Sequence, residues 1–320
     1  MIKSPAFTAA IMALSSRQLD HVRHQPRPVT LELYQYTIQL LLRQDPGKQD
    51  ASVLAACTLL LYEMMASGVH EWRRHLKGCA GHLQAQKWNG SSKGIVKSCF
   101  WAFARIDVWA AFVSRRTTLI PTDFWLEDMS IASVAAKGDA DDYCNLANLI
   151  FAEITPYMAS VSLLWSKLQD WRSLRPREVK PLLRNPPTSR SVFPEVLYSR
   201  STSICGIYHA GSILILQTGI LGPAVGETYP PNLAVWHARE LGGISISNPS
   251  HAYWVNQLQP LYIAGTVFAS SDNAPGFREE EEEYAAEKIL LLKHLARIER
   301  ETGWKTSDRA ASLRSIWELA

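Results

Sequence analysis

The stretch Leu60–Cys79, LLYEMMASGVHEWRRHLKGC, contains HEWRRH at residues 70–75, one residue away from the HExxH signature of zinc hydrolases. That signature places two histidines four residues apart, so that both imidazoles face one metal ion on the same side of a helix. Here His70 and His75 are five residues apart, which at 100° per residue separates them by about 140° around a helix. Arg73 and Arg74 would also repel a dication. The sequence therefore predicts no metal site in this stretch.

The same stretch predicts two consecutive helices. Residues 51–66 are apolar on nearly every side, which is typical of a central, buried helix. Gly68 is a suitable residue to end that helix. The next helix is expected over residues 70–86, with Trp72 and Leu76 facing inward and arginines facing outward. This pair of helices is the frame from which the fold is predicted.

The helical period continues over most of the chain. Convincing period-two strands are absent, and 192–196 and 243–246 are too short and isolated to count. We therefore expect an all-α, multi-helical fold of about ten helices in stacked antiparallel pairs. Residues 116–140 read as a surface excursion. The remaining expected helices cover residues 5–19, 29–43, 97–115, 141–174 with a bend at Pro156, 198–221, 232–246, 251–270 and 279–301, followed by a short terminal helix.

The length of 320 residues fits one domain over 1–320. A subdivision into an N-terminal half, 1–175, and a C-terminal half, 195–320, is also expected. The two halves would be joined by residues 176–194, which contain five prolines.

Composition narrows the class of protein. The chain has 33 Lys and Arg against 30 Asp and Glu, with a net charge of +3, which is too weak and too scattered to predict nucleic-acid binding. Its five cysteines are far apart and form no CxxC pair, so we expect no disulfide framework and a reducing intracellular setting. The N-terminus lacks the features of a signal peptide. The apolar run 207–225 carries His209, Gln217 and Pro223, which favours a buried helix over a membrane span.

A few polar side chains stand in apolar helical segments and are candidate functional residues. Arg105 and Asp107 interrupt an aromatic helix, and Glu63 and His209 lie in similarly apolar surroundings. Buried charges must be paired or face a cavity. They can therefore line a ligand pocket or act as buried anchors, for instance Arg105 with Glu63, and the anchor interpretation is favoured. His209 is most simply a hydrogen-bonded core histidine. No motif for a nucleophile, a phosphate loop or a dinucleotide site is found, so no catalytic residue, metal or cofactor is predicted.

Several segments together resemble the fungal-specific transcription factor domain, the regulatory region of fungal zinc-cluster transcription factors. The resemblance extends from about residue 5 to residue 320. Each block is loose by itself, but six in the same order are fairly specific. They are LLLYEMMASGVHEWRRHLKGC (59–79), ARIDVWAAFVSRRTTLIPTDFW (104–125), WSKLQDWRSLRP (165–176), IYHAGSILIL (207–216), QPLYIAG (259–265) and IERETGWKT (298–306) with Trp317.

The resemblance implies an all-α regulatory domain acting in the nucleus, with the cytoplasm as an alternative. In that family an N-terminal module with six closely spaced cysteines holds two zinc ions and reads DNA. This sequence does not show that module, so we expect no direct DNA binding by these residues alone. The resemblance implies no catalytic residues for this sequence. The matching positions are interpreted as architectural or pocket residues: Glu63, Trp72, His75, Arg105, Asp107 and His209.

Two hypotheses from different classes remain at this point. The first is a transcription-regulatory domain that responds to a small molecule or a partner protein, as a homodimer or as a heterodimer with related factors. The second is a helical scaffold reused as a biosynthetic enzyme, such as a cyclase of a secondary-metabolite gene cluster, or as a small-molecule-binding protein. Aromatic helices with embedded Arg and Asp motivate the second. A helical interaction scaffold without a ligand is a third, and a non-enzymatic role is favoured.

Overall fold

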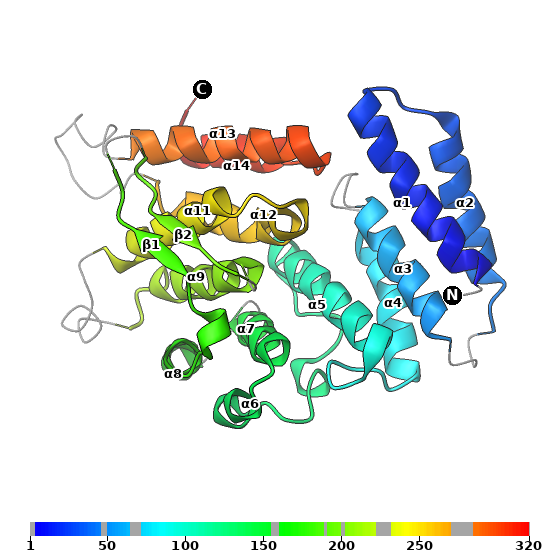
Figure 1. The fold of residues 1–320 in the computed structure, drawn as a ribbon, viewed down its shortest axis with the longest axis horizontal. Coiled ribbons are helices and arrows are strands. Elements are labelled where there is room, and N and C mark those ends of the chain that lie inside the picture. Colours follow the sequence, from blue (N-terminus) through cyan, green and yellow to red (C-terminus); the bar gives the residue numbers. More distant parts are fainter. Residues whose placement is uncertain are drawn as a thin grey trace. The chain divides into compact units, whose positions relative to one another are not determined.

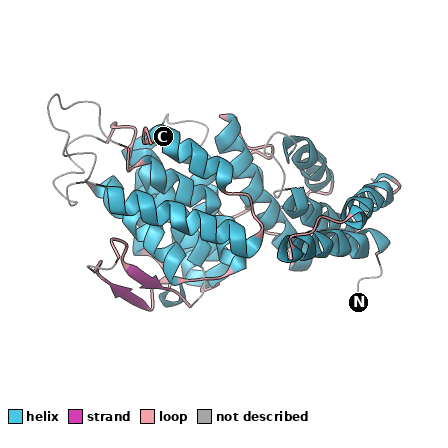
Figure 2. Cartoon of the chain, turned by 90° about the horizontal axis from the view of Figure 1, so that it is seen from above, coloured by secondary structure: helices cyan, strands magenta, loops and turns pink. Residues whose placement is uncertain are grey.

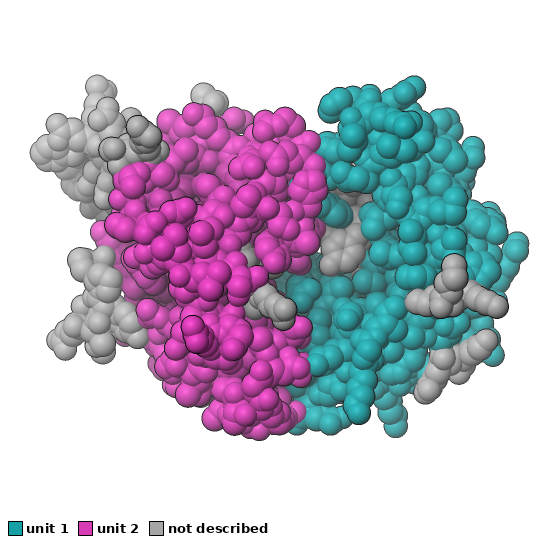
Figure 3. Space-filling model, viewed as in Figure 1, with its two compact units in different colours: residues 1–127, 302–305 teal, residues 128–301, 306–320 magenta. Residues whose placement is uncertain are grey.

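The structure is a computed structural model that describes residues 4–45, 50–64, 72–154, 160–188, 191–199, 202–221, 232–269 and 284–319. For residues 61–64, 72–74 and 202–204 only the backbone is described. The described residues contain 13 α-helices and one two-stranded sheet, which confirms the all-α prediction (Figure 1, Figure 2). They group into two compact units, residues 1–127 with 302–305 and residues 128–301 with 306–320, which Figure 3 colours separately.

Unit 1 is built from five α-helices. Ala6 and Ala10 of α1 and Ala56 of α3 form a buried cluster against which Phe7 and Leu59 pack. Alanines at these positions let the two helix backbones approach closely. The helices are α1 (Pro5–Arg23), α2 (Pro28–Leu42), α3 (Ala51–Met64), α4 (Trp72–Ala85) and α5 (Gly94–Ser114), followed by the 3₁₀ turn η2 (Thr122–Phe124).

The turn between α1 and α2 is held by polar side chains. Asp20 accepts hydrogen bonds from the backbone N–H of Arg27 at 3.2 Å and from the Thr30 hydroxyl at 2.6 Å. The Arg27 guanidinium pairs with the same carboxylate. The hydrogen bond from Thr30 is the largest of the effects that lower the pKa of Asp20 to about 2. These contacts fix the hairpin that places α2 beside α1.

A segment from near the C-terminus belongs to unit 1. Thr302, Gly303 and Trp304 lie against α1 and line a small cavity of about 40 Å³ together with His21. Gly303 has a φ of +76°, and a Cβ atom there would stand 2.7 Å from the His21 ring. Glycine is required at this position both for its left-handed backbone and for the close approach.

Unit 2 surrounds the buried helix α9. Its residues from Cys205 to Ile213 are buried, as expected for an apolar helix inside a protein. In the part of the chain that the structure describes, no helix combines the length and the apolar character needed to cross a membrane. Around α9 (Thr202–Leu216) lie α7 (Ala140–Ile154), α8 (Val161–Ser173), α11 (Leu233–Ser247) and α12 (His251–Thr266). The unit also contains α6 (Ile131–Lys137), η4 (Arg177–Val179), α13 (Ala285–Thr302), of which Thr302 belongs to unit 1, and α14 (Ser307–Ile316).

Two details of residues 116–174 differ from the sequence predictions. The single helix expected over 141–174 is two helices, α7 and α8, and residues 155–159, with Pro156, lie outside the described residues. Residues 116–140, expected as a surface excursion, contain η2 and α6.

A small antiparallel sheet was missed from sequence. Strand β1 (Leu183–Asn185) pairs with β2 (Glu195–Leu197), with Arg184 opposite Val196. Arg184 donates from Nε to the buried carboxylate of Glu240 on α11 at 3.0 Å. The proline-rich segment therefore contributes structure to unit 2. The subdivision at residues 176–194 stays a prediction, and the bounds of the two compact units lie elsewhere.

Candidate functional site

The six residues predicted from sequence are divided between the two units. Glu63 lies on α3 and Trp72 on α4, but their side chains are outside the described residues. His75 lies on α4, and Arg105 and Asp107 lie on α5, so five of the six belong to unit 1. His209 lies on α9 in unit 2. The expected pairing of Arg105 with Glu63 stays a prediction.

His75 is half-buried and faces α2. Its Nε2 atom lies 3.4 Å from the hydroxyl of Tyr34, and the two rings are 6.4 Å apart between centroids. Tyr34 is also half-buried. This contact connects α4 to α2.

Asp107 holds the loop after α5. Its carboxylate is 1% exposed and accepts hydrogen bonds from the backbone N–H of Leu119 at 2.7 Å and of Ile120 at 3.4 Å. The Ile120 carbonyl in turn accepts from the indole of Trp125 at 3.0 Å. Arg105 is half-buried on the same helix. The chain of contacts from Asp107 therefore positions a buried tryptophan.

His209 forms a buried pair with His237 of α11. Their Nδ1 atoms lie 2.9 Å apart, so one ring carries its proton on Nδ1 and donates it to the other. Burial, followed by the neighbouring His237, holds the pKa of His209 well below its usual value. Burial and Arg172 lower the pKa of His237 to about 3. Both rings are therefore neutral at physiological pH.

Aromatic rings extend from this histidine pair across unit 2. Tyr208 stacks on Trp171 with 5.5 Å between centroids, and Trp171 stacks on Tyr143 at 5.6 Å. The Trp171 indole donates to the Tyr143 carbonyl at 3.0 Å, and the Tyr143 hydroxyl donates to the Trp171 carbonyl. These contacts fix α7, α8 and α9 relative to one another.

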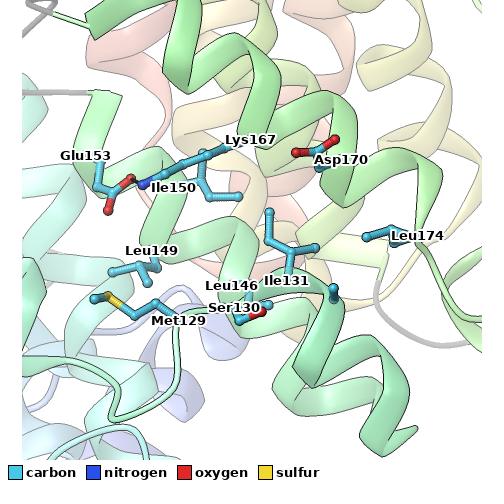
Figure 4. A pocket seen from close by; sticks show the side chains of 11 residues that line it. Met129, Ser130, Ile131, Leu146, Leu149, Ile150, Glu153, Lys167, Asp170 and Leu174 are labelled. Atoms are coloured by element: carbon cyan, nitrogen blue, oxygen red, sulfur yellow. Dashed lines mark hydrogen bonds and ion pairs between the residues drawn. The ribbon is translucent and has the colours of Figure 1, made fainter.

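A cavity in unit 2 lies between α6, α7 and α8. It has a volume of about 300 Å³, at the lower end of the range of small-molecule sites. Most of its wall is apolar. The lining residues are Met129, Ser130, Ile131, Ala132, Leu146, Leu149, Ile150, Glu153, Lys167, Asp170 and Leu174 (Figure 4).

Polar groups lie along one side of this pocket. Lys167 of α8 donates to the Glu153 carboxylate of α7 at 2.7 Å, and Figure 4 shows this ion pair at one end of the pocket. Asp170, one turn along α8 from Lys167, also lines the pocket and lies between Lys167 and Leu174 in Figure 4. An apolar wall with a few charged groups is the usual composition of a site for a small amphipathic molecule.

The short helix α6 is held in place by Asp128. This carboxylate accepts from the Lys137 ammonium at 2.7 Å, from the Ser133 hydroxyl at 2.7 Å and from the Ser130 backbone at 3.0 Å. The hydrogen bond from Lys137 is the largest cause that lowers the pKa of Asp128 to about 2. Gly138, at a φ of +74°, ends the helix. Local sequence thus builds one wall of the pocket.

Sequence reasoning did not find this pocket. Ile131 lies in the segment expected to be a surface excursion, and Leu146 and Lys167 lie in the segment expected to be one helix. The available signal was the helix start at Ser130 and stop at Gly138. Among the residues that the structure describes, no group of three or more His, Cys, Asp or Glu is arranged to hold a metal ion.

One family of known proteins matches nearly the whole chain. The family described as "Fungal specific transcription factor domain" matches residues 1–319, and the chain belongs to this family.

One relative is "Transcription activator AMTR1" of Alternaria alternata, which is 24% identical over 358 aligned residues. The alignment covers 85% of this chain and 44% of the relative, so the chain spans less than half of the relative's length. No solved structure matches the chain. The family and the relative support a role in the regulation of transcription.

Proposed function

We propose that this chain is the regulatory domain of a fungal transcription regulator and acts in the nucleus. The family match over residues 1–319 carries this proposal, and the transcription activator from Alternaria alternata supports it. Unit 2 of this all-α architecture contains a pocket, and a pocket is suited to binding a small effector molecule rather than to reading DNA.

The pocket between α6, α7 and α8 is the proposed effector site. It is bounded by apolar residues and by the Glu153–Lys167 ion pair, so a small molecule with an apolar body and a polar group would match its wall. Because α7 and α8 are connected to α9 through stacked aromatic rings, a ligand that shifts these helices would change the packing of the buried helix.

The second part of the proposal is that these residues do not contact DNA by themselves. The net charge of +3 supports it, because a DNA-binding domain needs a concentrated basic face. Contact with a promoter would then come through a partner protein, either another copy of the chain or a related factor.

A reporter assay tests the regulatory role. Residues 1–320 are fused to a heterologous DNA-binding module, and transcription from a promoter carrying that module's site is measured. The fusion should change reporter output relative to the module alone. No change in either direction would contradict the regulatory role.

Two variants test the effector site in the same assay. Ala132 is exposed and lines the pocket, so Ala132→Trp should fill the pocket and shift reporter output. Ala136 is exposed on the same helix and is outside the pocket lining, so Ala136→Trp is a matched control that should leave output unchanged. Equal output from both variants would contradict the pocket's role while leaving the regulatory role intact.

DNA contact is measured separately. Fluorescence anisotropy of the chain with duplex DNA at physiological salt should show at most the weak binding of a non-specific protein, with a Kd of roughly 1–100 μM. Tighter, sequence-dependent binding would refute the second part of the proposal.

The enzyme hypothesis makes a different prediction. Deletion of the gene should alter target transcripts if the chain is a regulator. Unchanged transcripts together with an accumulated biosynthetic intermediate would instead favour an enzyme and would overturn the proposed function.

A further inference from the structure

Helix α2 presents an unusually apolar surface to solvent in unit 1. Leu42 is 81% exposed and Leu31 is 59% exposed, and Val29 and Tyr36 on the same helix are also exposed. Single exposed apolar residues are ordinary, but several on one short helix mark an interaction surface.

Two of the exposed apolar residues of α2, Leu31 and Leu42, belong to a regular seam, whereas Val29 and Tyr36 lie on another side of the helix. Leu31, Gln35, Ile38 and Leu42 follow one another at spacings of four, three and four residues, which places them along one side of a helix. The seam covers three turns, or about 16 Å. Ile38 is half-buried and the other three side chains are exposed, so this side of α2 is accessible.

Charges beside the seam are arranged in a self-complementary way. Glu32 is the only charged side chain within α2, and Arg43 caps its C-terminal end with a helical backbone conformation. Both are exposed. They are 11 residues apart, close to three full turns, so they lie on the same flank of the helix. A flank with a negative charge at one end and a positive charge at the other matches a copy of itself in the opposite direction.

We propose that the α2 seam binds the α2 seam of a second copy of this chain in an antiparallel, two-fold symmetric contact. Leu31 packs against Leu42 of the second copy, and Gln35 packs against Ile38 of the second copy. A two-fold axis keeps the charged flanks on the same side, so Glu32 faces Arg43 of the second copy. Because of the two-fold symmetry, each of these residue pairs occurs twice in the dimer.

The contact is small. Specific interfaces usually bury more than about 1,000 Å² in total, and a seam of three turns lies at or below that size. We therefore expect a weak, concentration-dependent dimer rather than an obligate one. A weak contact of this kind can contribute to a larger assembly in which other contacts add to the affinity. This role deepens the partner part of the proposed function and rests on it, although self-association is measured without any transcription assay.

Sedimentation analysis of residues 1–320 over a range of concentrations tests the contact. The chain should form a reversible dimer at tens to hundreds of micromolar. Leu42→Glu should abolish it, because the charge would be buried against Leu31 of the second copy. Val113→Glu, at a similarly exposed apolar position of α5 in the same unit, is the matched control and should leave dimerisation unchanged. Circular dichroism checks that each variant keeps its helical content.

Charge exchange tests the antiparallel geometry. Glu32→Arg places two like-charge pairs in the dimer, as does Arg43→Glu, so each single variant should raise the Kd by roughly 5- to 30-fold. The double variant should return the Kd to within about threefold of the original. A mixture of the two single variants should also associate, because both arginines of the Glu32→Arg copy would face glutamates of the Arg43→Glu copy.

The outcomes are distinct. A chain that stays monomeric up to millimolar concentration overturns the proposal. A dimer that resists Leu42→Glu uses another surface, and a dimer whose single charge variants are not rescued by the double variant is not antiparallel along α2. None of these results bears on the reporter assay, so failure of the dimer and failure of the regulatory role are distinguishable.

Discussion

Replacement of Asp107 by alanine should loosen the loop after α5. The carboxylate accepts one short hydrogen bond from Leu119, at 2.7 Å, and one long bond from Ile120, at 3.4 Å. A hydrogen bond to a charged group contributes about 1.5–3 kcal/mol, and the long bond adds less. Asp107→Ala should therefore cost about 2–4 kcal/mol of local stability. Asp107→Asn keeps an oxygen acceptor and should cost about 1–2 kcal/mol.

Hydrogen exchange measures this loss directly in the affected loop. A cost of about 2–4 kcal/mol should speed exchange of the amides of residues 117–125 by roughly 30- to 1,000-fold, because every 1.4 kcal/mol is a factor of ten. Asp123→Ala, at an exposed position of the same loop, is the control and should change exchange there by less than about threefold. If Asp107→Ala exchanges like the control, Asp107 is not an anchor of this loop.

Three further predictions concern other contacts. The pKa of His237 is about 3 in the folded chain and about 6.5 in the unfolded chain. Between these two pH values the unfolded chain binds a proton at His237 that the folded chain does not bind. The free energy of unfolding therefore falls as pH falls, by about 1.4 kcal/mol per pH unit. His237→Gln should therefore flatten the loss of stability between pH 6.5 and pH 5 in urea unfolding, and an unchanged slope would contradict this. Gly243→Ala would place a Cβ atom 2.2 Å from the Pro194 carbonyl oxygen and should lower the free energy of unfolding by about 1–3 kcal/mol or more. Gly81→Ala is the control, because a Cβ atom at Gly81 would have no other atom within 4 Å; this variant should be neutral or stabilising by up to about 1 kcal/mol. Lys167→Met removes a half-exposed ion pair with Glu153, so it should change the free energy of unfolding by less than about 1 kcal/mol while it alters reporter output. A large loss of stability with normal reporter output would mean that the ion pair has a structural role and no role in regulation.

The helical architecture could be predicted because local sequence determines it. The apolar residues on nearly every side of 51–64 are a signal that acts within a few residues, whereas helix α6 was not predicted although Ser130 and Gly138 mark its ends. Strands β1 and β2 are three residues each, and their pairing across the proline-rich segment carries no period of its own. For residues 141–174 the sequence predicted one helix with a bend at Pro156, and the structure has two helices, α7 and α8.

The candidate site was harder to predict than the fold because it depends on packing. The pocket needs side chains from three helices, and none of Ile131, Leu149 and Asp170 is unusual in its own segment. His209 was identified from its apolar surroundings, but its partner His237 lies 28 residues away and no spacing rule connects the two. The buried carboxylate of Asp107 was identified in the same way, while its acceptor role for loop amides appears only in three dimensions.

The short segment 302–305 has a consequence for how the chain folds during synthesis. Because it completes unit 1 against α1, and because residues 128–301 come between, unit 1 lacks its last piece until residue 305 has left the ribosome. At roughly 5–20 residues per second, that delay is on the order of ten seconds or more. During that interval Leu14, Arg17 and His21 of α1 lack their native neighbours Thr302, Gly303 and Trp304. Because residues 302–305 belong to unit 1 and lie between two segments of unit 2, neither unit corresponds to one continuous stretch of the gene.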